Sequence, residues 1–276
     1  MPNRIINTAF ILKNIYVIML LVLMVCQGCD YKFKSADADG TLIAVKRYDR
    51  LESRYLTTGD FSALQEMNTE YPMETRTLVE KVLQLGEASD QKLNNRFLMF
   101  FQDSVLQTLI SDVEAEYANV DDLNKGLNDA FDNLDKMLPG IPRPGVYLQI
   151  SALDQSIIVG DNMIGVSLDK YMGSDYQLYK KYYTPQQMAT MKRSYIVPDC
   201  LCFYLLSLYP MKNFDKRPQH ERDIHVAKVL WVVNKSIKCN LFKNKYVSKI
   251  DKYMKCNRKL SVRQMLESDD YTQLND

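Results

Sequence analysis

The stretch that decides the fold is Val146-Tyr-Leu-Gln-Ile150, followed by Ser156-Ile-Ile-Val159 and Met163-Ile-Gly-Val-Ser167. Each run is short and rich in β-branched residues, and Gly160-Asp-Asn162 between the last two is a turn signal. These features predict three short strands joined by short loops, as in an antiparallel meander. The run Leu42-Ile-Ala-Val45 is the candidate for a fourth strand.

Helical patterns lie on both sides of this stretch. Upstream, Asp60 is a predicted N-cap for a helix over Phe61–Glu70. Downstream, Thr184-Pro185-Gln-Gln187 combines an N-cap, a proline at the first helical position and a capping-box glutamine. Apolar residues also recur at helical spacing in three stripes: Phe97, Phe101, Val105 and Leu109; Leu123, Leu127, Phe131, Leu134 and Leu138; and Val226, Leu230, Val233 and Ile237.

This order of elements predicts an α+β fold that is predominantly helical. A small antiparallel sheet of about three to four strands would lie between two helical segments. The composition is that of a globular protein, with 46% hydrophobic and 25% charged residues. We predict a single mostly helical domain over residues 41–276.

The first forty residues indicate export and lipidation. Residues 1–28 contain the apolar run Ile15–Cys26, which has the length of a signal-peptide core rather than of a membrane span. Gly28-Cys29 then resembles the lipobox of a bacterial lipoprotein, although Cys26 and Gln27 depart from its usual residues. Acyl chains, palmitate among them, on Cys29 would anchor the protein in a lipid bilayer. Residues 29–40 would form the tether. An uncleaved anchor or an ordinary cleaved signal is the alternative.

Charge and histidine content restrict the chemistry. With 35 Lys+Arg against 34 Asp+Glu, the net charge of +1 argues against a nucleic-acid partner. His220 and His225 are the only histidines and lie five residues apart, so a regular helix directs them about 140° apart. We therefore predict no metal site, no cofactor and no histidine triad. Four cysteines remain, Cys200, Cys202, Cys239 and Cys256, for which buried free thiols are favoured over a Cys239–Cys256 disulfide.

Tyrosine is the densest unusual feature. Eight tyrosines fall between Tyr171 and Tyr209, and such rings suit either a binding face or inward packing with satisfied hydroxyls. Asp199 opens an otherwise apolar helix. It is either a dipole-favoured acid of the first turn or a buried acid with a raised pKa in a site.

Several segments together resemble the gliding-motility lipoprotein B family. They are Val45-Lys-Arg47-Tyr-Asp49, Val166-Ser-Leu-Asp169-Lys-Tyr171-Met-Gly-Ser-Asp175-Tyr176-Gln-Leu-Tyr179, Met191-Lys-Arg-Ser-Tyr195-Ile-Val-Pro-Asp199 and Ala227-Lys-Val-Leu-Trp231. The resemblance implies an envelope lipoprotein linked to motility and secretion machinery, with a distant similarity to zinc-peptidase-like folds. In those folds a helix after the sheet carries His-Glu-x-x-His, and the corresponding helix here, from Tyr195, has no histidine.

Two functions follow as hypotheses. The first is a non-catalytic lipoprotein, expected in the outer membrane, that binds or scaffolds other envelope proteins. Its candidate binding residues are Asp169, Tyr171, Asp175, Tyr176, Tyr179, Tyr195 and Asp199. The second is an envelope hydrolase, directed at peptide or glycan, that uses carboxylates of this set on a zinc-peptidase-like scaffold without its metal site.

Overall fold

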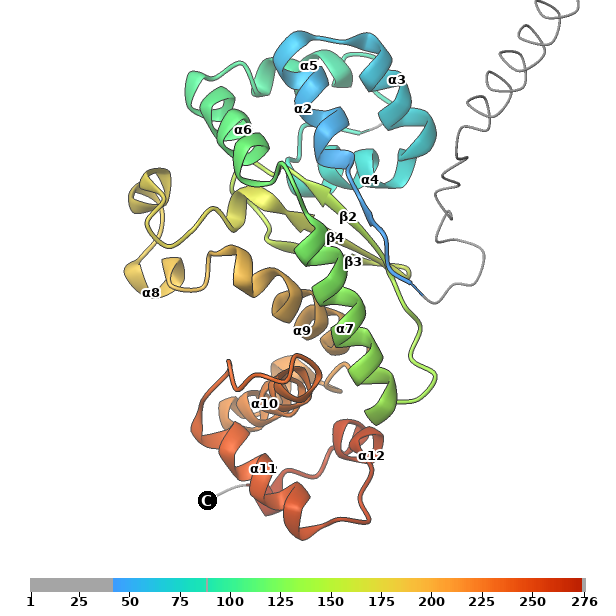
Figure 1. Ribbon diagram of the computed structural model, residues 1–276, viewed down its shortest axis with the longest axis vertical. Coiled ribbons are helices and arrows are strands. Elements are labelled where there is room, and N and C mark those ends of the chain that lie inside the picture. Colours follow the sequence, from blue (N-terminus) through green and yellow to red (C-terminus); the bar gives the residue numbers. More distant parts are fainter. Residues whose placement is uncertain (1–41, 88, 275–276) are drawn as a thin grey trace, which may run out of the picture. The chain divides into compact units, whose positions relative to one another are not determined.

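The computed structural model describes residues 42–87 and 89–274, and the predicted signal, Cys29 and the tether lie outside them. The described residues cluster as one compact unit. Most of its described residues are helical, and they surround a four-stranded sheet (Figure 1). The predominantly helical α+β class is therefore confirmed.

The sheet consists of β1 (Val45–Lys46), β2 (Gly145–Gln149), β3 (Ile157–Gly160) and β4 (Met163–Ser167) in the order β1-β2-β4-β3. The predicted antiparallel meander is wrong, because β2 pairs with β4 in parallel, as β1 does with β2. Only β3 and β4 form the antiparallel hairpin, at the Asp161-Asn162 turn. The chain reverses direction twice between β2 and β4, which restores parallel orientation, and β3 takes the edge of the sheet.

The helices are α2 (Tyr48–Thr58), α3 (Phe61–Glu70), α4 (Pro72–Arg76), α5 (Leu93–Phe100), α6 (Ser104–Glu116), α7 (Asp121–Met137), α8 (Pro185–Met188), α9 (Ile196–Leu208), α10 (Gln219–Ser236), α11 (Lys245–Cys256) and α12 (Val262–Glu267). A π-helical turn, η2 (Thr77–Val82), extends α4. Short 3-10 turns are η3 (Leu168–Lys170), η4 (Gln177–Lys181), η5 (Arg193–Tyr195), η6 (Phe214–Lys216) and η7 (Thr272–Leu274).

Local capping explains several helix ends. The Asp60 carboxylate accepts from the backbone of Ser62 at the start of α3, and Thr184 and Gln187 form the predicted capping box of α8. One predicted stripe is divided between two helices. The helix through Phe97 ends at Phe100, and Asp103 caps α6 by accepting from Val105 and Leu106. A strong N-cap therefore interrupts the apolar spacing.

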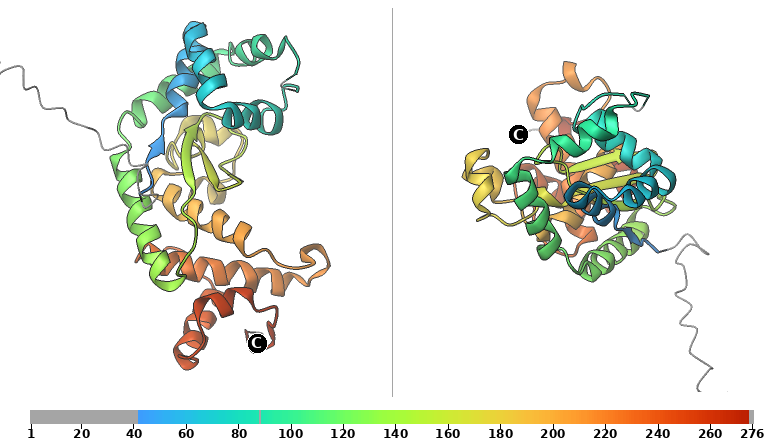
Figure 2. Two further views of the ribbon diagram at one scale, coloured as in Figure 1. Left: turned by 90° about the vertical axis from the view of Figure 1, so that its right-hand side faces the viewer. Right: turned by 90° about the horizontal axis from the view of Figure 1, so that it is seen from above.

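The two faces of the sheet differ in polarity, and helices cover both (Figures 1 and 2). Val146, Leu148, Ile164 and Val166 alternate with Tyr147, Gln149, Gly165 and Ser167, so the second set shares the other face. That second face lies under α2, where Tyr48 makes an edge-to-face ring contact with Tyr147 at 6.2 Å. A single apolar cluster continues from these strands into α9 and α10.

Candidate functional site

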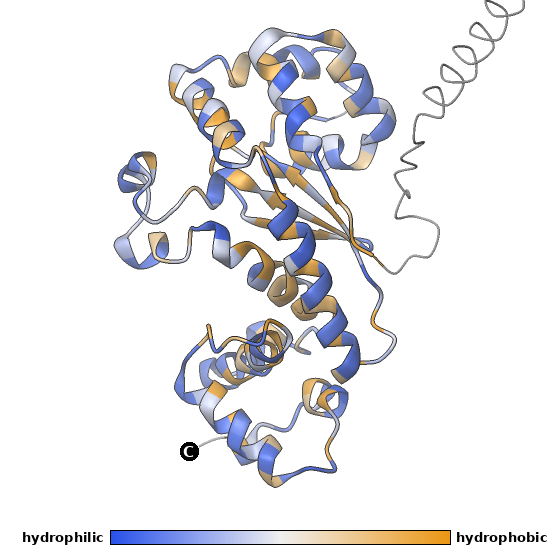
Figure 3. Ribbon diagram, viewed as in Figure 1, coloured by the Kyte–Doolittle hydropathy of each residue, from blue (hydrophilic) through white to orange (hydrophobic). Residues whose placement is uncertain are grey.

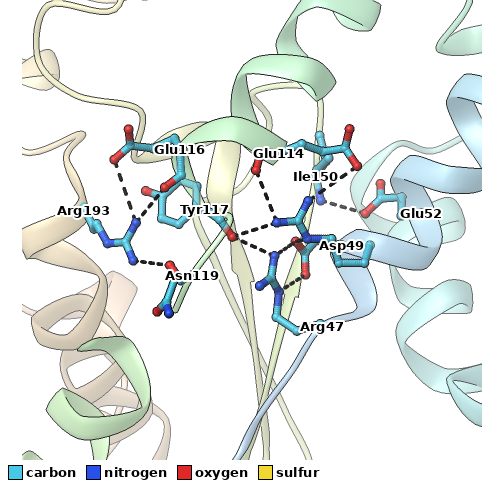
Figure 4. A network of polar contacts seen from close by, with 10 residues as sticks. Arg47, Asp49, Glu52, Glu114, Glu116, Tyr117, Asn119, Ile150 and Arg193 are labelled. Atoms are coloured by element: carbon cyan, nitrogen blue, oxygen red, sulfur yellow. Dashed lines mark hydrogen bonds and ion pairs between the residues drawn. The ribbon is translucent and has the colours of Figure 1, made fainter. Parts of the chain in front are cut away.

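The end of α6 is the centre of a polar network that joins distant segments (Figure 4). Arg47 forms a forked ion pair with Asp49, at 2.9 and 2.7 Å, and donates to the carbonyl oxygen of Tyr117 at 2.9 Å. Arg50 donates to the same carbonyl at 3.0 Å. Both guanidinium groups thus lie at the negative end of the α6 dipole, where cations are stabilising.

Arg193 holds the same helix end from the opposite side (Figure 4). Its guanidinium donates to the carbonyl oxygens of Glu116 and Asn119 at 2.9 and 2.7 Å, and to both carboxylate oxygens of Asp122 at 2.9 and 2.6 Å. It also lies 4.8 Å from the ring centroid of Tyr117. This hydrogen bonding raises the pKa of Arg193 and lowers that of Asp122. The η5 turn is therefore fixed to the loop between α6 and α7.

Two tyrosines extend the network from this point to the first turn of α9. The Tyr117 hydroxyl donates to the carbonyl oxygen of Tyr171 at 2.6 Å, and the Tyr171 hydroxyl donates to Oδ2 of Asp199 at 2.8 Å. Burial raises the pKa of both tyrosines, and it raises the pKa of Asp199 to about 6 against the opposing effect of the Tyr171 bond. Asp199 is therefore a largely buried acid whose neutral form is favoured by its surroundings.

Asp169 is an interior residue with a positioning role. It is fully buried, and its carboxylate accepts from the backbone N–H groups of Ser151 and Leu153 at 2.9 and 2.5 Å. These bonds shape the loop between β2 and β3. Burial raises its pKa despite these donors. Asp169 is thus not exposed to a partner, which corrects its prediction as a direct contact residue.

A second buried carboxylate lies between α2 and the sheet. Glu52 accepts from the backbone N–H of Ile150 at 2.8 Å through Oε2, whereas no hydrogen-bond partner faces its Oε1 among the described residues (Figure 4). Burial is the main cause that raises the pKa of Glu52, and the nearby Asp169 and Asp49 carboxylates add to it. This side chain ties α2 to the end of β2.

The tyrosine-rich segment projects from the sheet as an arm, Gly173–Met191, which includes η4 and α8 (Figures 1 and 2). The bridge between Met172 and Lys192, and the bond from Gly173 N–H to the Met191 carbonyl at 3.0 Å, close its base.

Inside the arm, Tyr179 is fully buried. Its hydroxyl donates to the Asp169 carbonyl at 2.5 Å and accepts from the Met172 N–H at 2.9 Å. The Tyr176 hydroxyl donates to Asp112 at 2.7 Å. Tyr179 therefore supports the arm from within and is not part of a contact surface.

The remaining predicted residues are more accessible. Asp175 is exposed, whereas Tyr176 and Tyr195 are half-buried. Tyr195 lies away from the arm and packs edge-on against Phe242 at 6.3 Å. The most exposed ring of the arm belongs to Tyr182, at 65% exposure, which the sequence prediction did not single out. The predicted contact face is thus divided into interior residues and an exposed arm.

Other predicted groups have structural roles. His225 is buried, with Nε2 bonded to the Tyr209 carbonyl at 2.9 Å, whereas His220 is exposed. Among residues 42–87 and 89–274, no group of three or more His, Cys, Asp or Glu residues is placed to hold a metal ion. The four cysteines found there are free: Cys200 and Cys202 are buried as predicted, but Cys239 and Cys256 are exposed, which corrects their prediction as buried thiols.

The polar network and two cavities of the described part occupy different places. A cavity of about 620 Å³ lies among α7, α9 and the end of α10, and another of about 580 Å³ lies beside His225. None of the seven predicted binding residues lines either of them. The hydrogen bonds around Tyr117 join segments that are distant in the sequence.

Comparison with known proteins gives this network a context. The family described as Gliding motility protein GldB matches residues 34–245. The chain belongs to this family. The GldB family match includes Arg47, Tyr117, Tyr171 and Asp199, which take part in these contacts. Three of these four lie in the segments that carried the resemblance.

Membership of the GldB family indicates a role and a location that the geometry of the site alone does not indicate. It makes this chain a lipoprotein associated with gliding motility and with the cell envelope. No curated protein and no solved structure matches the chain, so the similarity to zinc-peptidase-like folds stays a prediction. In the part of the chain that the structure describes, no helix is both long and apolar enough to cross a membrane.

Proposed function

We propose that the protein is a non-catalytic lipoprotein of the outer membrane, anchored by acyl chains on Cys29, which binds another envelope protein through the arm Gly173–Met191. Membership of the GldB family supports the envelope location. The observation that carries the binding role is the arm itself, an ordered projection with an exposed aromatic ring at Tyr182.

The interior of the arm holds the backbone that carries Tyr182, whose N–H donates to the Tyr179 carbonyl at 3.0 Å. Tyr179 makes edge-to-face contacts with Tyr176 at 5.1 Å and with Tyr183 at 5.7 Å. The Tyr183 hydroxyl donates to the Leu153 carbonyl at 2.7 Å, which ties the arm to the loop between β2 and β3. A preorganised arm loses little entropy on binding, and exposed tyrosine is enriched at the energetic centres of interfaces.

Site-specific photo-crosslinking in cells tests the binding role. A photoreactive residue in place of Tyr182 is expected to give a defined protein adduct, and Tyr182→Ala is expected to reduce co-purification of the same protein. The matched control replaces Phe61, which is 78% exposed on α3. Equal adducts from both positions would contradict the role of the arm. Loss of labelled palmitate from Cys29→Ala tests the anchor separately.

The hydrolase alternative rests on one observation, the pKa of Asp199 raised to about 6 beside the Tyr171 hydroxyl. Perturbed acids of this kind are enriched in active sites. Hydrolysis of envelope peptide or glycan by the purified protein, abolished in Asp199→Asn but kept in Asp215→Asn at an exposed acid outside the candidate set, would favour this function over the binding role.

A further inference from the structure

The charge of the chain is strongly segregated, although its sum is close to zero. Residues 235–259, here called the basic segment, contain nine cations: Lys235, Lys238, Lys243, Lys245, Lys249, Lys252, Lys255, Arg258 and Lys259. Asp251 is the only acid in this segment. The segment therefore carries a formal charge of +8, and the rest of the chain carries −7 to give the overall +1. Such asymmetry indicates an interaction with a polyanion.

The fold gathers these cations on one face. Lys245, Lys249, Lys252 and Lys255 recur at intervals of four, three and three along α11, which places them on one side of that helix. Val247 and Ile250 on the other side are buried, and α11 packs against α10. Figure 3 shows α11 with a high share of hydrophilic residues. The lysines thus cover the side of α11 that faces away from the core.

A hollow of about 630 Å³ lies within this face, between α10 and α11. Four lysines line it: Lys235, Lys238, Lys252 and Lys255. The Asp251 carboxylate also lines it and pairs with Lys235 at 2.9 Å and Lys255 at 2.6 Å, while it accepts from Trp231 Nε1 at 3.0 Å. These bonds lower the pKa of Asp251, so its charge is already balanced within the hollow.

The other cations of the hollow have no such partner. Among the described residues, neither Lys238 nor Lys252 forms an ion pair, and both are exposed. Lys245 is likewise exposed, close to the Tyr246 ring at 4.7 Å. Asp129 interacts electrostatically with Lys238, but Asp251 is the only acid of the basic segment, so the exposed lysines leave a net positive field directed to the solvent. Phosphate groups complement that field.

We infer that this face, α11 together with the end of α10, docks on the phosphate headgroups of an anionic bilayer. The inference rests on the proposed anchor, because the membrane that holds Cys29 is then the nearest extended anion. The thirteen residues from Cys29 to Leu42 span at most about 45 Å, which keeps the domain at a high effective concentration beside the lipid. The family match ends at residue 245, so most of this face belongs to the part of the chain beyond it.

Fluorescence in proteoliposomes tests this inference on the full lipidated chain. Cys239→Ser leaves Cys256, at the end of α11, as the exposed thiol of the described residues, and it accepts an environment-sensitive dye. The dye fluorescence is expected to show contact with the bilayer in vesicles with 30% phosphatidylglycerol. That response should disappear in phosphatidylcholine vesicles or in high salt. Co-flotation with the vesicles reports the anchor independently, so failure of the anchor and failure of the face are distinguishable.

Two charge variants distinguish binding through this face from a general effect of the net charge. Lys238→Glu/Lys245→Glu/Lys252→Glu changes cations of the face that lack ion pairs. It should lower the equilibrium constant for docking by at least about a hundredfold, since the loss of each lysine near an anionic surface costs about fivefold and the new acids are repelled. Lys81→Glu/Lys92→Glu/Lys216→Glu makes the same charge change at exposed sites elsewhere and should retain docking.

Three results would overturn the inference. The first is an equal dye response in both lipids, and the second is an equal loss in both variants. The third is a stronger response to duplex DNA than to phosphatidylglycerol, which would assign the face to nucleic acid. Circular dichroism and thermal unfolding establish that both variants are folded.

Discussion

The hydroxyl of Tyr171 donates to Oδ2 of Asp199 across 2.8 Å and so joins the chain after β4 to the first turn of α9. Both segments lie within the part of the chain that matches the GldB family. Because Asp199 is mostly buried, burial raises its pKa to about 6, although a hydrogen bond from a hydroxyl alone lowers it. The pair therefore couples the stability of the domain to pH.

The direction of that coupling follows from the two pKa values of Asp199. The pKa is about 6 in the folded protein and about 3.9 in an unfolded chain. The folded state thus binds the proton more tightly. The contribution of the protonated Asp199 carboxyl to the stability of the domain is therefore fully present below about pH 4 and is lost as the pH rises through 6.

Asp199→Asn should remove this dependence, because asparagine stays neutral and still accepts from Tyr171. Relative to the wild type, the variant should gain roughly 2 kcal/mol in unfolding free energy between pH 4 and pH 7. Urea unfolding at four pH values measures this gain. Asp175→Asn, on the exposed part of the arm, is the control. Parallel pH profiles for wild type and Asp199→Asn would contradict the prediction.

Tyr117→Phe should destabilise the protein through a carbonyl left without its donor. The Tyr117 hydroxyl donates to the Tyr171 carbonyl at 2.6 Å, and both side chains are buried. A buried polar group that loses its partner costs about 1–3 kcal/mol. Chemical denaturation measures the loss. Tyr182→Phe makes the same change on an exposed ring and should be nearly neutral; equal effects would argue against the role of the buried bond.

Arg193→Lys should weaken the clamp on the end of α6 even though it keeps the charge. Arg193 bonds to two carbonyl oxygens and both oxygens of Asp122, and an ammonium group has no planar fork to reproduce this geometry. We expect a loss of about 1 kcal/mol in unfolding free energy. Hydrogen exchange should also increase at the end of α6. Arg258→Lys, at an exposed site of the basic segment, is the control and should leave both measurements unchanged.

Gly165→Ala should disrupt the sheet because Tyr147 of the neighbouring strand lies over this glycine. A Cβ at position 165 would lie 2.5 Å from both Cζ and Oη of Tyr147, which is 3% exposed. Overpacking of this kind costs about 1–3 kcal/mol. Thermal unfolding gives the measurement. Gly160→Ala, whose Cβ meets nothing within 4 Å at the end of β3, should change stability by less than about 0.5 kcal/mol. A similar melting temperature for the two variants would contradict the contact.

The candidate site was only partly predictable, for a physical reason. Asp199 and Tyr171 stood out in the sequence because one acid opens an apolar helix and the tyrosines are dense. Tyr117 and Arg193 carry no such local signal, since their roles arise from contacts across more than fifty residues of chain. The sequence prediction did not include the basic segment, because the net charge of +1 averages its cations with the acids of the rest of the chain.

The sequence by itself determined the elements: the helical stripes, the caps at Asp60 and Thr184, the short strands and the resemblance to the GldB family. These depend on spacing and on local hydrogen bonds within a few residues. Only the tertiary structure decided the strand order, the burial of Asp169 and Tyr179, and the face on which the lysines gather. Those features depend on which distant segments pack together, and the spacing of residues along the chain does not show this.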